Sequence, residues 1–252
     1  MRRALARLVL GAGLLATLRA APDLAGLRSA AAAAEAHQDS RAALALYRQL
    51  EAACPREAFI LRKISRQYSD LADEAPDAAE QQRLAQAALD YAQRAVAADP
   101  RDPVGVLSVA VSFGKLAAFG DTRAKVRCSR LVHDGAERAL ALDPGYAWAH
   151  HVLGRWHVAV ATLGVGARVW VRVFYGGMPA ASVAEGIRQL QLATELEPGE
   201  LSHFLELGFA WAADGRRAEA EAAWRHGLAM PSRGPHDDFA KRRAQDALAN
   251  YR

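Results

Sequence analysis

Three neighbouring histidines could bind a metal ion or transfer protons. His150, His151 and His157 lie within eight residues of one another, and neutral imidazole is a common metal ligand. A helical zinc site usually shows the pattern His-Glu-x-x-His. No Asp or Glu lies between these histidines, and Glu follows none of them. We therefore expect no metal ion and no cofactor, with His150 and His157 packed inside the repeat and His151 left as a candidate for binding.

No other group of residues has the composition of a catalytic site. The pair His133-Asp134 is isolated, and the chain has no Gly-rich phosphate signature or nucleophile motif. Cys54 and Cys128 match no metal-ligand or disulfide spacing, so we expect small buried hydrophobes. The sequence predicts a protein that is not an enzyme.

The segments that carry these residues are separated by regularly placed prolines. Their separations are 45, 44, 54 and 33 residues, for Pro55, Pro100, Pro144, Pro198 and Pro231. Proline ends a helix because it lacks a backbone N–H and disfavours helical geometry in the residue before it. The last separation is close to the tetratricopeptide period of about 34 residues. The longer ones predict insertions in three units.

Small residues recur where two helices of a unit would cross. Leu153-Gly154 and Leu207-Gly208 follow successive prolines, and a small second residue permits close crossing. Alanine is abundant and β-branched residues are sparse, which favours helix over sheet. We predict an all-α, tetratricopeptide-like helical-hairpin solenoid over residues 24–231, with long insertions. A capping helix over residues 236–252 would cover its end.

The N-terminal segment has the composition of a targeting sequence. Arg2, Arg3 and Arg7 precede an apolar run over residues 8–18, which predicts a signal peptide or N-terminal anchor over residues 1–21. The run is shorter than the roughly 20 residues of a membrane span. We expect an exported protein, periplasmic or membrane-attached. The alternative is a mitochondrial or cytoplasmic location in a eukaryotic cell.

The basic charge of the chain belongs to this leader. The net charge is +4, but Arg2, Arg3, Arg7 and Arg19 all precede the first acid, Asp23. Without these four, 28 basic residues balance 28 acidic ones. The body of the protein therefore lacks the excess charge of a nucleic-acid-binding domain.

A protein or peptide segment is the expected partner. The first helices of stacked hairpins form a concave groove, and arginine can grip a carboxylate through two parallel hydrogen bonds. We expect the bound segment to be acidic. The alternative is that these are ordinary solvated charges. The predicted groove residues are Phe59, Arg62, Arg66, Lys115, Trp148, His151, Arg155 and Phe209.

Two further stretches could form surface sites. Arg123, Lys125, Arg127 and Arg130 could form an anion-binding patch, although such runs are usually the solvated side of a helix. The apolar run over residues 169–175 could touch a membrane, but we favour an extra helix that folds over its own stack. Membrane contact is then expected only through the N-terminal segment.

Several stretches together resemble the regulator of microtubule dynamics family. They are HHVLGRW (150–156), an insertion ending in FYGGMP (174–179), EGIRQLQLATELEP (185–198) and the segment over residues 204–231. The likeness covers roughly residues 35–250. The sequence departs from the family at Val106 and Leu107, where a Trp is common, and at Met178, where a second proline is common.

The resemblance implies a helical-repeat adaptor and, in animal members, microtubule association. Our leading interpretation is a non-enzymatic, exported adaptor that would be a bacterial relative of the family. The alternative is a eukaryotic microtubule-associated or organelle-tethering member.

Overall fold

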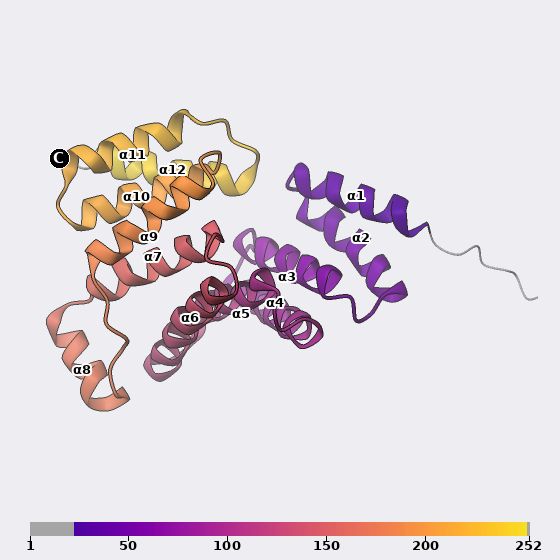
Figure 1. Cartoon of the computed structure of the whole chain (residues 1–252), viewed down its shortest axis with the longest axis horizontal. Coiled ribbons are helices and arrows are strands. Elements are labelled where there is room, and N and C mark those ends of the chain that lie inside the picture. Colours follow the sequence, from indigo (N-terminus) through magenta and orange to yellow (C-terminus); the bar gives the residue numbers. More distant parts are fainter. Residues whose placement is uncertain (1–22, 251–252) are drawn as a thin grey trace, which may run out of the picture.

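The computed structural model describes residues 23–250, and their regular structure is entirely helical (Figure 1). The predicted leader, residues 1–21, lies outside the described residues. The helices are α1 (Leu24–Ala36), α2 (Ser40–Ala53), α3 (Ala58–Asp73), α4 (Ala78–Ala98), α5 (Pro103–Leu116), the 3-10 turn η1 (Ala117–Phe119), α6 (Thr122–Leu142), α7 (Ala147–Ala161), α8 (Val165–Tyr175), α9 (Val183–Leu196), α10 (Leu201–Ala213), α11 (Arg217–Ala229) and α12 (Pro235–Asn250).

Aspartates and prolines set the ends of these helices. The carboxylates of Asp39, Asp77 and Asp121 accept hydrogen bonds from the backbone N–H three residues further on, which caps α2, α4 and α6. Each of the five repeat prolines lies two residues beyond a helix end, after α2, α4, α6, α9 and α11. The proline spacing therefore marks the unit boundaries.

The helices pair as antiparallel hairpins that follow one another along a curved stack (Figure 1). The pairs are α1–α2, α3–α4, α5–α6, α7–α9 and α10–α11. The predicted solenoid is confirmed. The second and third units are lengthened by α4 and α6, which have 21 residues each. The fourth unit is lengthened by α8, which is inserted between its two helices.

Glycines bring the paired helices into close contact. A Cβ on Gly154 would lie 2.9 Å from the carbonyl oxygen of Gly186, so α7 and α9 cross where both residues lack a side chain. A Cβ on Gly208 would lie 2.3 Å from the Trp224 ring in the α10–α11 pair. The Leu-Gly pattern therefore marks helix crossings, as its spacing predicts.

The two cysteines differ in burial. Cys128 is buried, whereas Cys54 is only half-buried.

The last helix occupies the place of a further first helix. α12 packs on α10 and α11, and Ala244 is fully buried there. Ala240, Ala247 and Leu248 complete this apolar contact. α12 thus covers the end of the stack.

The insertion helix α8 stands beside the stack rather than over it (Figure 1). It contacts α6, and Val171 is its one buried residue. Among the described residues, no single helix is long and apolar enough to cross a membrane. The pair α7 and α8 meets that test jointly, but is bent by 102°.

Candidate peptide-binding groove

The first helices of the units lie on one side of the stack, and several of them contact one another. α3 contacts α5, and α10 contacts both α7 and α12. Because neighbouring helices approach most closely on the inner side of a curved stack, this side is the concave one. The predicted groove residues all come from α3, α5, α7 and α10.

The cations of α3 have intramolecular partners. Arg62 lies over the ring of Phe59, 4.9 Å from its centroid, and pairs with Asp102 at 3.2 Å. Arg66 pairs with Asp70 at 3.5 Å, and its side chain remains 67% exposed. Arg66 is therefore the more accessible of the two.

Lys115 lies beyond this pair, near the C-terminal end of α3. Its ammonium group pairs with the carboxylate of Asp73, and its side chain is mostly buried. An acidic ligand would have to compete with Asp73 for this cation.

Trp148 and His151 belong to an aromatic cluster between α7 and α10, in which Trp148 is half-buried and His151 is buried. His151 is 4% exposed, and its Nδ1 lies 2.9 Å from Nδ1 of His203 on α10. The Trp148 ring contacts both histidines. In this arrangement His151 packs between α7 and α10 rather than facing the groove. His150 and His157 are buried as well.

Burial determines the charge state of this histidine pair. It lowers the pKa of His151 well below its usual value and lowers the pKa of His203 to about 4. Both rings are therefore neutral at pH 7. One Nδ1 donates a hydrogen bond and the other accepts it.

Arg155 and Phe209 line a pocket of about 170 Å³ that opens between α7, α9, α10 and α12. The Glu206 carboxylate faces two guanidinium groups there. It lies 3.5 Å from that of Arg155, and it accepts a hydrogen bond of 2.5 Å from Nη1 of Arg243. Arg243 also lies over the Phe209 ring, 4.1 Å from its centroid. This pocket brings two predicted residues together with two that were not predicted.

The repeat period could have identified Arg243. Arg66, Arg155 and Phe209 each lie 11 residues after a repeat proline, and Arg243 lies 12 residues after Pro231. The shift of one residue arises because α12 begins four residues after its proline, whereas α3, α7 and α10 begin three residues after theirs. Treating α12 as a further first helix, and not only as a cap, would have placed Arg243 in the groove.

The segment between α11 and α12 and the first turn of α12 reach back to the start of the stack. His236 Nε2 lies 3.9 Å from Asp70 Oδ1 on α3, and burial raises the pKa of Asp70. A Cβ on Gly234 would lie 2.4 Å from the side chain of Gln38. The chain itself therefore borders the groove at this end, which the polar sequence of the segment did not suggest.

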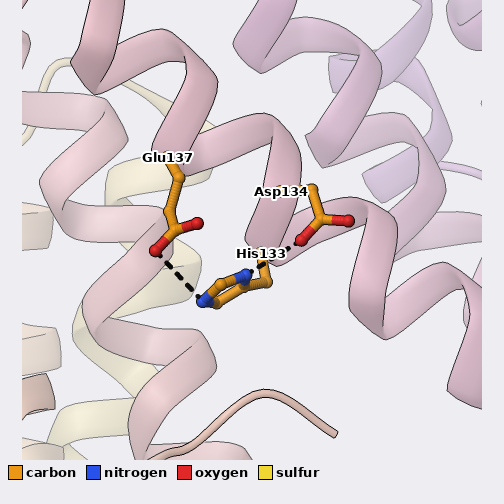
Figure 2. A group of neighbouring side chains, drawn as sticks. All are labelled: His133, Asp134 and Glu137. Atoms are coloured by element: carbon orange, nitrogen blue, oxygen red, sulfur yellow. Dashed lines mark hydrogen bonds and ion pairs between the residues drawn. The ribbon is translucent and has the colours of Figure 1, made fainter.

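Figure 2 shows a separate cluster of metal-ligating residue types on α6. Nδ1 of His133 lies 3.0 Å from Asp134 Oδ1, and its Nε2 lies 3.4 Å from Glu137 Oε1. The two carboxylates approach different ring nitrogens, and both are largely exposed. This geometry suits a hydrogen-bonded imidazole better than ligands converging on one ion.

Sequence comparison decides the family. The family described as "Regulator of microtubule dynamics protein 1-3" matches residues 27–252. The chain belongs to this family. It is 28% identical to Regulator of microtubule dynamics protein 3 of Xenopus laevis over 139 residues, which cover 55% of this chain and 30% of that protein. Against protein 2 of Mus musculus the identity is 22% over 197 residues, covering 78% and 48%.

These matches span between about a third and a half of the relatives' own length. Among solved structures, a thermophilic tetratricopeptide repeat protein of Thermus thermophilus is similar with a TM-score of 0.65 and 19% identity. The similarity covers 90% of this chain and 99% of that one. This likeness shows the tetratricopeptide fold.

Proposed function

We propose that this member of the regulator of microtubule dynamics family is a non-enzymatic adaptor that binds an acidic protein segment in its concave groove. The pocket formed by Arg155, Glu206, Phe209 and Arg243 carries the proposal. It combines two guanidinium groups with one carboxylate and an aromatic ring on the first-helix side.

The pocket has donors to spare for a carboxylate. Each guanidinium has five N–H donors, and Glu206 occupies only some of those on Arg155 and Arg243. A second carboxylate can bridge the two arginines through charge-assisted hydrogen bonds, which are stronger than neutral ones. The Phe209 ring offers apolar contact area beside it. A C-terminal carboxylate or an acidic side chain could bridge the two arginines, and the apolar atoms of the same segment could contact Phe209.

Accessibility ranks the predicted cations. Arg66 and Arg155 are more than half exposed and meet their own carboxylates at 3.5 Å, so they can turn toward a ligand. Arg62 and Lys115 are mostly buried against Asp102 and Asp73. The binding energy for an acidic segment should therefore come mainly from Arg66, Arg155 and Arg243.

A matched pair of variants tests this function. Peptides with a free C-terminal carboxylate are compared with amidated ones by fluorescence anisotropy, using Arg155→Gln/Arg243→Gln and the control Arg41→Gln/Arg242→Gln. Arg41 and Arg242 are exposed and are not groove residues. We expect at least about tenfold weaker binding in the groove variant only, since a charged hydrogen bond contributes roughly 1.5–3 kcal/mol. Equal binding by both variants would exclude this pocket.

Family membership supports a second candidate function, association with microtubules. The matched relatives carry the name regulator of microtubule dynamics. Co-sedimentation with microtubules would test it. If the wild type pellets with microtubules and Arg155→Gln/Arg243→Gln pellets less, this activity lies in the same groove. If the wild type does not pellet, this candidate function is excluded.

We also propose that the protein is exported or membrane-attached. The leader, with its early arginines and apolar run over residues 8–18, supports this location. N-terminal sequencing of the protein from its native cell tests it. A new N-terminus near Ala21 is expected for a cleaved signal, whereas an intact chain in the soluble cytoplasmic fraction would contradict the proposal.

A further inference from the structure

We propose that α8 docks this protein on an anionic lipid surface, lying flat with its apolar side in the headgroup region. The helix exposes large apolar side chains that no other described segment covers. Val165 is 70% exposed and Phe174 66%, and Trp170 is also exposed. Such a concentration of exposed apolar residues on one short helix marks an interaction surface.

These apolar residues form one continuous side of α8. At about 100° per residue, Val165, Val169 and Val173 line up along the helix, and Trp170 and Phe174 lie beside them. The buried residue, Val171, points to the opposite side. The apolar side therefore faces away from α6 and the stack.

The structure holds α8 by its C-terminal end. Nε of Arg130 on α6 donates to the Gly177 carbonyl oxygen at 3.1 Å, and the same guanidinium donates to the Tyr175 carbonyl oxygen. Gly176 and Gly177 have positive φ angles of 78° and 83°, which turn the chain sharply back toward α9. The apolar side is thus presented on a fixed helix.

Basic side chains lie on α8 outside its apolar side and on the neighbouring helix α6. Arg168 and Arg172 lie on α8 and are exposed. Arg123 and Arg127 are exposed on the same side of α6 as Arg130, because they precede it by seven and three residues. The sequence has no Asp or Glu from residue 144 to residue 184 or from residue 122 to residue 133. The acids that bound this part of α6 are Asp121, just before the helix, and Asp134.

This combination favours a lipid surface over other partners. Helices that lie in a membrane interface combine Trp, Phe and aliphatic residues with Lys or Arg, and anionic headgroups supply the missing counter-charge. α8 has 11 residues, about 16 Å, which is half of a bilayer's hydrocarbon thickness. A second copy of the chain would place arginines against arginines without a carboxylate between them.

Hydrogen exchange over residues 163–177 tests the proposal on the full chain, because this local readout is independent of the leader. The probes are phosphatidylcholine vesicles with and without phosphatidylglycerol. We expect slower exchange in this segment with the anionic vesicles only, and loss of this protection at 1 M salt, where the screening length is about 3 Å.

Two variants and two controls separate the contributions of the apolar and the basic residues of α8 to vesicle binding. Trp170→Ser/Phe174→Ser should abolish the protection, whereas Phe239→Ser, which alters a similarly exposed side chain (64%) on α12, should retain it. Arg168→Glu/Arg172→Glu should weaken binding at least about 25-fold, since each basic residue near an anionic surface contributes about 1 kcal/mol. Arg41→Glu/Arg242→Glu should leave binding unchanged.

Three results would overturn the proposal. The first is equal protection by neutral and anionic vesicles. The second is unchanged protection in Trp170→Ser/Phe174→Ser. The third is protection that rises with protein concentration in the absence of vesicles, which would identify a second copy of the chain as the partner.

Discussion

The buried pair His151 and His203 makes the contact between α7 and α10 sensitive to acid. Burial holds the pKa of both rings below the 6.5 expected in the unfolded chain, and that of His203 at about 4. Between these values the unfolded chain binds more protons than the folded one. The contribution of the two neutral rings to the free energy of unfolding is therefore complete above pH 6.5 and is lost as the pH falls toward 4.

The size of this effect follows from the shift of His203, which is fully buried. One pKa unit corresponds to about 1.4 kcal/mol, so His203 alone should reduce the free energy of unfolding by about 2 kcal/mol between pH 7.5 and pH 5. His151, with its own lowered pKa, adds to the loss.

Urea unfolding at pH 7.5 and pH 5.0 measures this loss. The variant His151→Phe/His203→Leu removes both titrating rings and should lose at least about 2 kcal/mol less than the wild type over this interval. His37→Gln, at an exposed position, should behave like the wild type. If the double variant and the wild type lose equal stability, the explanation from burial is wrong.

Three further predictions concern packing and local order. Gly208→Ala should destabilise the protein by about 1–3 kcal/mol, because its Cβ would overlap the Trp224 ring. Gly166→Ala in α8 has open space around it and should be neutral or stabilising. Thermal unfolding measures both effects. Arg130→Ala should release the C-terminal end of α8 and speed limited proteolysis between α8 and α9, without lowering the melting temperature by more than a few degrees. His236→Gln should accelerate hydrogen exchange over residues 231–238, because it removes the imidazole ring that lies 3.9 Å from Asp70 of α3. Unchanged rates in either of the last two variants would contradict the contacts described.

The fold was predictable because its signals are local and repeated. A proline two residues beyond each second helix and a Leu-Gly pair at helix crossings can both be recognised without knowing what packs against them. The insertion helix was harder to place. Its apolar residues suggested a helix that packs over the stack. Burial, however, requires a free surface on the stack, and Val171 is the one residue of α8 that is buried there.

The sequence could predict which side of the stack the candidate groove residues occupy, but not which side chains they pair with. The repeat register places Arg66, Arg155 and Phe209 on the first-helix side. It does not reveal that each exposed cation faces a carboxylate of its own chain. Nor does it reveal that His151 meets His203, 52 residues away, in a buried cluster. Such pairings depend on side chains from different units.

Photo-crosslinking in the groove tests the central claim most directly. A photoreactive amino acid in place of Phe209 is activated in the native cell, and the adducts are identified by mass spectrometry. The account predicts a discrete protein adduct through an acidic segment, lost in Arg155→Gln/Arg243→Gln and kept in Arg41→Gln/Arg242→Gln. An adduct pattern that is the same in both variants would contradict it.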